Sequence, residues 1–227
     1  MACAVAGSSP HLTRPSSPSS PQVARCLDEA SKDPTVRVSV LTGDPAGKAF
    51  CAGADLSPGG PHNPTSMQGD VPEGRPANLG YWRDGGGTAG LAIMRSTKPV
   101  ICAINGAAVG VGMTLPLACD ITVAAEGAKV GFVFGKRGLT MECLSSYMLE
   151  KCVGHKVAME LVLTGRIMRA EDAPGGLFNY VVPRDEVMSK VLGICAVSSH
   201  GIGTCEMDGS EESMGHGSEE SGNAQLF

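Results

Sequence analysis

The sequence predicts an α/β fold, and three observations support this prediction. Valines alternate with polar residues over residues 36–40, which is typical of a strand with one face more exposed to water. Residues 100–104 are continuously apolar, as in a strand that is buried on both faces of a sheet. Short apolar segments then alternate with stretches of helical length and periodicity. Strands and helices that alternate along a chain indicate an α/β protein.

The remaining elements follow in chain order. Further strands are expected at residues 121–125 and 178–182, and helices at 111–117, 142–151 and 155–163. The last helix has Val157 and Leu161 at helical spacing, and Gly165 follows it as a stop signal.

Composition divides the chain into one globular domain between two tails. Residues 1–24 are rich in Ser and Pro, so we expect a disordered tail there. Residues 25–192 form the expected domain, interrupted over 57–90 by a long loop dense in Gly, Pro and Asn. Residues 193–227 are rich in Gly, Ser and Glu, and we expect a second disordered tail.

Charge and hydropathy argue against several classes of function. The 227 residues are 42% hydrophobic and 18% charged, with a formal net charge of -5 and no basic run. This composition offers no electrostatic basis for binding nucleic acid or an anionic membrane. No apolar stretch approaches the roughly 20 residues of a membrane-spanning helix, so we expect no membrane span.

The cysteines and the two ends of the chain bear on the compartment. None of the 9 cysteines has a partner at the two-residue gap of zinc or redox motifs, so we expect no metal site and no disulfide framework. This usage favours a reducing, intracellular compartment. The N-terminal segment has no secretory hydrophobic region, and the final Gln-Leu-Phe is not a standard peroxisomal tripeptide, so no clear targeting signal is expected.

Two segments of small residues carry the candidate chemistry. Residues 49–56 (AFCAGADL) follow a strand and a Gly-rich turn, and residues 105–112 (NGAAVGVG) follow the buried strand and open a helix. Small residues let a ligand lie close to the backbone, and free amides at a helix start favour a developing anion. Amides from two such segments could form an oxyanion hole. Either segment alone is also compatible with an ordinary tight connection.

Several segments resemble the crotonase superfamily, also called the enoyl-CoA hydratase/isomerase family, in order, spacing and content. The matching segments are residues 38–43 (VSVLTG), 49–56, 98–106 (KPVICAING), 119–121 (CDI), 158–165 (AMELVLTG) and 170–173 (AEDA). The resemblance implies a spiral of repeated β-β-α units, here apparently shortened at both ends, and assembly as a homo-trimer or hexamer. It also implies an acyl-CoA thioester substrate, with coenzyme A as part of the substrate and no separate cofactor.

The resemblance also implies which residues form the site. It assigns the oxyanion hole to the backbone amides of Ala54 and Val111. Neighbouring positions are expected to bind the substrate: Ala52, Gly53, Asp55, Leu56, Gly110 and Phe134.

The two glutamates used by hydratases of this family are absent. Their positions hold Thr114 and Phe134, which argues against ordinary water addition. A different carboxylate, Glu142, lies in residues 138–147 (GLTMECLSSY), which resemble the peroxisomal type of Δ3,Δ2-enoyl-CoA isomerase. In that type the corresponding glutamate is the catalytic base. One carboxylate suffices for an isomerase, because it can take a proton from C2 and return it at C4.

The sequence leaves alternatives open for this glutamate and for the whole chain. The apolar neighbours Phe134, Leu139 and Met141 are expected to raise the pKa of Glu142, yet it could also be an ordinary solvated first-turn residue of a helix. The leading hypothesis is an enoyl-CoA isomerase of fatty-acid or related acyl-CoA metabolism. The others are a hydratase or another crotonase-type enzyme, and an inactive acyl-CoA-binding or subunit-interaction protein. The resemblance implies a peroxisome or mitochondrion.

Overall fold

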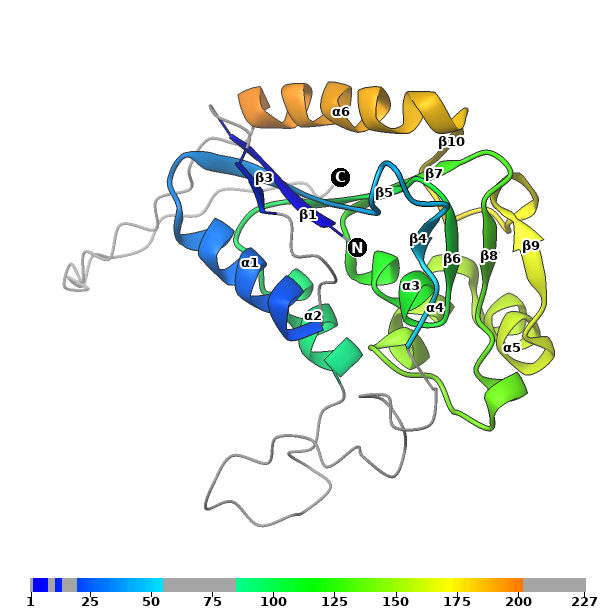
Figure 1. Cartoon of the computed structure of the whole chain (residues 1–227). Coiled ribbons are helices and arrows are strands. Elements are labelled where there is room, and N and C mark those ends of the chain that lie inside the picture. Colours follow the sequence, from blue (N-terminus) through cyan, green and yellow to red (C-terminus); the bar gives the residue numbers. More distant parts are fainter. Residues whose placement is uncertain (1, 8–10, 14–19, 55–84, 202–227) are drawn as a thin grey trace, which may run out of the picture.

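The structure, a computed structural model, describes residues 2–7, 11–13, 20–54 and 85–201 (Figure 1). The strands are β1 (Ala2–Gly7), β2 (His11–Thr13), β3 (Val36–Thr42), β4 (Ala49–Cys51), β5 (Val100–Ile104), β6 (Ala107–Val109), β7 (Ile121–Ala125), β8 (Lys129–Gly131), β9 (Ile167–Arg169) and β10 (Tyr180–Val182). The α-helices are α1 (Ser20–Lys32), α2 (Gly85–Met94), α3 (Val111–Thr114), α4 (Ser145–Val153), α5 (His155–Thr164) and α6 (Val187–Gly201). Short 3-10 turns are η1 (Pro116–Ala118), η2 (Gly135–Arg137), η3 (Ala170–Asp172) and η4 (Arg184–Glu186).

The larger of two sheets holds the core of the protein. Its strand order is β10-β7-β5-β3-β1-β2, and β5 pairs in parallel with both β3 and β7. All of β5 is buried, because α6 lies on one side of this sheet and the pair α1 and α2 lies on the other (Figure 1). The predicted α/β fold is confirmed, and so is the prediction that residues 100–104 are covered on both faces.

The smaller sheet brings the two small-residue segments together. Its order is β4-β6-β8-β9, and β4 pairs in parallel with β6 through Ala49↔Ala107 and Cys51↔Ala108. Parallel strands have their carboxyl ends at the same edge of a sheet. The residues that follow β4 and those that follow β6 therefore leave the sheet side by side.

The N-terminal region differs from the expected disordered tail over residues 1–24. β1 pairs with β2 and with the edge of β3, both antiparallel, and α1 already begins at Ser20. Val23 and Leu27 of α1 are buried in the core. The expectation is wrong for these described residues, because β1 provides hydrogen-bond partners for a strand edge that would otherwise stay open.

Two further expected boundaries are wrong. Residues 85–90 belong to α2 and not to the expected loop over 57–90, whose other residues, 57–84, lie outside the described part. The buried face of α2 consists of Gly86, Ala89, Gly90 and Ile93. Tertiary packing therefore overrides the low helix propensity of glycine. Residues 193–201 belong to α6 and not to the expected tail, because Cys195 packs into the core; residues 202–227 lie outside the described part.

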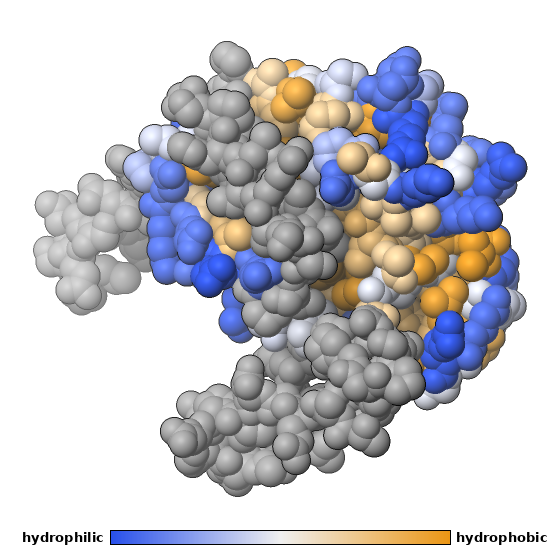
Figure 2. All heavy atoms as spheres, in the orientation of Figure 1, coloured by the Kyte–Doolittle hydropathy of each residue, from blue (hydrophilic) through white to orange (hydrophobic). Residues whose placement is uncertain are grey.

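Apolar side chains are also exposed on two parts of the surface. Figure 2 shows them along α6 and near β9. The exposed apolar residues of α5, β9 and α6 are Met159, Leu163, Ile167, Met188, Leu192 and Val197. Within the described ranges, no helix combines the length and the apolar character needed to cross a bilayer.

Lys98 joins the end of α1 to the start of β5. Its ammonium group donates hydrogen bonds to the carbonyl oxygens of Ala30, at 2.8 Å, and of Asp33. Cations near a helix C-terminus stabilise carbonyls that lack intrahelical partners. Replacing Lys98 by methionine keeps most of the aliphatic chain and is expected to lower the free energy of unfolding by about 1–3 kcal/mol in urea denaturation.

Lys129 on β8 provides the matched control for Lys98, because its side chain is exposed. Lys129→Met is expected to change the free energy of unfolding by less than about 0.5 kcal/mol. An equal fall in the free energy of unfolding in the two variants would show that Lys98 does not cap α1.

Candidate active site

Two glycines with left-handed backbone let the segments after β4 and β6 touch. Gly53 has φ 97° and Gly110 has φ 56°, a region that glycine adopts without steric cost. A Cβ on Gly53 would lie 3.2 Å from the carbonyl oxygen of Val109, and one on Gly110 would lie 3.7 Å from Gly53 Cα. The absence of side chains therefore allows direct backbone contact between the two turns.

The predicted oxyanion-hole residues lie at the end of these turns. Val111 is the first residue of α3, where helix geometry supplies no acceptor for the N–H group, and the Gly110 carbonyl accepts hydrogen bonds from Met113 and Thr114. Ala54 follows Gly53 and is exposed. Both residues stand at the carboxyl edge of the smaller sheet, an arrangement suited to binding the oxygen of a thioester. Their role as an oxyanion hole stays a prediction.

The carboxylate of Glu142 lies against the same turn of α3. The hydroxyl of Thr114 donates a hydrogen bond of 2.8 Å to Glu142 Oε1. On the side of β4, burial raises the pKa of the Cys51 thiol, and the negative charge of Glu142 raises it further. The structure thus brings the carboxylate close to both segments that were singled out in the sequence.

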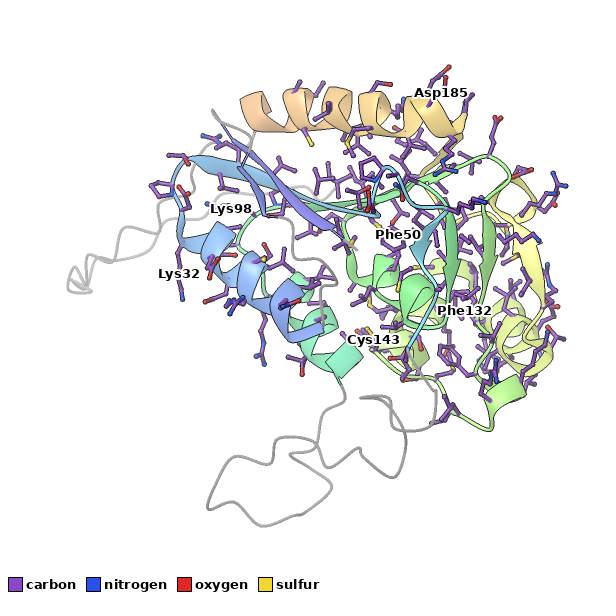
Figure 3. The ribbon with its side chains drawn as sticks, in the orientation of Figure 1. Lys32, Phe50, Lys98, Phe132, Cys143 and Asp185 are labelled. Carbon is purple, nitrogen blue, oxygen red and sulfur yellow. The ribbon has the colours of Figure 1, made fainter. Side chains whose placement is uncertain are left out.

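The backbone after Glu142 is unusual and firmly held. Cys143 and Leu144 have φ of 51° and 65°, which residues with a side chain rarely adopt and which is common at functional sites. The N–H and the hydroxyl of Ser145 both donate to the Glu142 carbonyl oxygen, at 2.9 and 2.6 Å. The thiol of Cys143, which Figure 3 labels, donates to the Gly86 carbonyl of α2 at 2.9 Å.

This geometry corrects the expected helix over residues 142–151. The helix α4 begins at Ser145, three positions after Glu142, because the left-handed residues cannot continue helical backbone. Glu142 is half-buried and accepts the Thr114 hydroxyl. It is therefore not the solvated first-turn residue that the sequence left open as an alternative.

The other predicted binding residues have mixed outcomes. Ala52 and Gly53 directly follow β4, beside Gly110, whereas Asp55 and Leu56 lie outside the described residues. Phe134 is buried in the core, with its ring centroid 6.5 Å from that of Phe132, which Figure 3 labels. Contact of these residues with substrate stays a prediction.

The apolar surroundings expected for Glu142 are only partly present. Leu139 is 41% exposed and Met141 is half-buried, whereas Phe134 belongs to the core. Ser145, Cys143 and the hydroxyl of Thr114 were missed as partners of the Glu142 segment. For Thr114, one signal was available: three residues after Val111, it returns to nearly the same face of the helix.

Comparisons with known proteins identify the family of this chain. The model of the enoyl-CoA hydratase/isomerase family matches residues 19–204. The chain is 35% identical over 186 residues to enoyl-CoA hydratase ACTT3 of Alternaria alternata, covering 80% of this chain and 58% of that protein. It is 36% identical over 168 residues to 1,2-epoxyphenylacetyl-CoA isomerase of Escherichia coli K12, covering 74% and 60%.

Solved structures of proteins from this family also resemble the chain. A monofunctional enoyl-CoA isomerase from M. smegmatis superposes with a TM-score of 0.62 at 30% identity, covering 81% of this chain and 72% of that one. This likeness confirms the crotonase-like fold that the resemblance implied. The chain spans between half and two thirds of the length of the curated relatives it matches. It belongs to the enoyl-CoA hydratase/isomerase family, within the crotonase superfamily.

Proposed function

We propose that the protein is an enoyl-CoA isomerase that converts a 3-enoyl-CoA into the conjugated 2-enoyl-CoA, with Glu142 as the base. The observation that carries the proposal is the hydrogen bond between Glu142 and Thr114, on the short helix that begins with Val111. It supports the proposal because the carboxylate contacts the short helix whose first amide is assigned to the thioester oxygen. The isomerase-like motif around Glu142 supports the same assignment.

The chemistry follows from these positions. The amides of Ala54 and Val111 bind the thioester oxygen and stabilise the enolate more than the ground state, because the enolate carries more negative charge there. Glu142 takes a proton from C2, and the electron pair delocalises over the conjugated system. The protonated carboxyl group then returns the proton at C4. The atoms balance with one carboxyl group and no further reactant.

Hydration is the second candidate, because relatives are named as hydratases. In this chain the two positions of the hydratase glutamates hold Thr114 and Phe134, and both are buried. Neither side chain can serve as a second carboxylate to activate water. The residues at these positions therefore favour isomerisation over hydration.

Product analysis with the purified protein tests this choice. With 3-enoyl-CoA we expect the ultraviolet absorbance of a conjugated 2-enoyl thioester to rise, with no 3-hydroxyacyl-CoA formed. Formation of 3-hydroxyacyl-CoA when 2-enoyl-CoA is supplied would show hydration and overturn the proposal. Binding of either thioester in calorimetry without turnover would identify an inactive acyl-CoA-binding protein.

We also propose that the protein assembles as a homo-trimer or hexamer, as the family resemblance implies. The exposed apolar residues of α5 and β9, such as Leu163 and Ile167, are compatible with burial between subunits. Sedimentation equilibrium measures the assembly, and a monomer at micromolar concentration would contradict it. The peroxisome or mitochondrion stays a prediction.

A further inference from the structure

The hydroxyl of Thr114 is buried between the two functional parts of the site. Thr114 is 0% exposed, and its Oγ1 lies 2.8 Å from Glu142 Oε1 and 3.4 Å from the carbonyl oxygen of Val111. A hydroxyl has one hydrogen to donate, and a carboxylate only accepts. The shorter distance and the charge of the acceptor make the bond to Glu142 the dominant one.

We propose that Thr114 is a positioning residue, which fixes the Glu142 carboxylate at a set place relative to the amide of Val111. This inference rests on the proposed isomerase function. The backbone N–H of Thr114 donates to the Gly110 carbonyl at 3.1 Å, and its β-branched side chain has few rotamers. The hydroxyl is thus rigidly attached to the helix that starts with Val111. Such fixed spacing favours a reactive alignment of thioester and base.

The hydrogen bond also acts on the ionisation of Glu142. A donor to a carboxylate favours the charged form, so Thr114 lowers the pKa of Glu142 relative to a site without it. Among the described residues, the Cys51 thiol of β4 interacts electrostatically with this carboxylate, and the neighbouring Cys143 thiol donates to the Gly86 carbonyl. The sequences of α2, α3 and η1 contain no ionisable side chain. On α4, Tyr147, Glu150 and Lys151 are exposed and Cys152 is half-buried.

Replacing Thr114 by valine removes the hydroxyl and keeps the shape of the side chain. We expect kcat for isomerisation to fall about 10- to 100-fold, with KM within about twofold, because the change affects the base and leaves thioester binding in place. The acid limb of the kcat profile should move to higher pH, since a base with a raised pKa ionises later. Thr114→Ser is expected to restore most of kcat and to return the acid limb of the pH profile to its wild-type position.

A matched variant separates this effect from the general loss of a buried hydroxyl. Thr42 is buried in β3, and its hydroxyl donates to the Ala103 carbonyl at 3.1 Å. Thr42→Val is expected to lower stability without moving the pH profile. If Thr114→Val does not fold, Thr114→Ala serves the same comparison, because a smaller side chain cannot overpack the site.

Carbon-13 NMR of glutamate carboxyl groups gives a readout that does not need activity. The signal of Glu142 is the one missing in Glu142→Gln, and its titration midpoint should rise in Thr114→Val and stay near wild type in Thr114→Ser. An unchanged midpoint in the valine variant would overturn the inference, whatever the activity. An altered midpoint in a protein without isomerase turnover would support the Thr114 contact and overturn the proposed function.

Discussion

Replacement of Glu142 by glutamine is expected to lower kcat for isomerisation by about 10²- to 10⁴-fold, the usual contribution of a general base. The glutamine oxygen can still accept the Thr114 hydroxyl that now lies 2.8 Å from the carboxylate. The amide cannot take up the proton from C2. The thermal unfolding midpoint and the affinity for a saturated acyl-CoA should therefore stay near wild type while turnover is lost.

Glu150 is the control for this experiment. It lies on α4, is exposed, and contacts His155 at 3.5 Å on the surface. Glu150→Gln removes the same charge from the same region, so kcat should stay within about twofold of wild type. Wild-type turnover in the Glu142 variant would exclude this carboxylate as the base. An equal fall in kcat in both variants would indicate a general effect of removing a negative charge.

Much of the central fold could be predicted because burial on both faces leaves a clear sequence signal. The expected strands at residues 100–104 and 121–125 coincide with β5 and β7. Hydrophobic runs bounded by polar residues mark strands whose neighbours cover them completely. The helix end at Gly165 was also predictable, because its φ of 53° is a conformation that favours glycine.

The segments whose structure was predicted wrongly depend on partners far away in the chain. Gly85 to Gly90 resemble a loop in composition, but Gly90 packs against Cys143 and Leu144, where a Cβ would lie 3.1 Å from the thiol. Close packing of this kind selects glycine within a helix, although intrinsic propensity disfavours it. β1 likewise depends on pairing with β3, which no local pattern reveals.

In the candidate site, too, some features follow from local sequence and others depend on distant residues. Glu142, Ala54 and Val111 could be singled out from local motifs. The bond from Thr114 to Glu142 spans 28 residues, and the left-handed backbone at Cys143 and Leu144 follows no glycine or asparagine signal. Sequence alone suggested the candidate groups, whereas their relative placement needed the three-dimensional structure.

Gly112 is where the second large effect is expected, because α3 presses directly on β4 at this residue. A Cβ added to Gly112 would meet the carbonyl oxygen of Cys51 and lie 2.8 Å from Cys51 Cβ. Backbone atoms of a paired strand cannot move aside as a flexible side chain can. Gly112→Ala is therefore expected to lower the free energy of unfolding by about 2–3 kcal/mol or more, measured by urea denaturation.

Activity should fall together with stability in this variant, because the added methyl group separates the two turns that hold Ala54 and Val111. Gly175→Ala is the matched control: its Cβ would meet nothing within 4 Å, and we expect a change in stability below about 0.5 kcal/mol with full activity. If Gly112→Ala were as stable and as active as Gly175→Ala, the close approach of α3 to β4 would not be needed for the site. A folded Gly112 variant that still binds acyl-CoA but no longer turns it over would show that the spacing of the two amides, more than their presence, sets the rate.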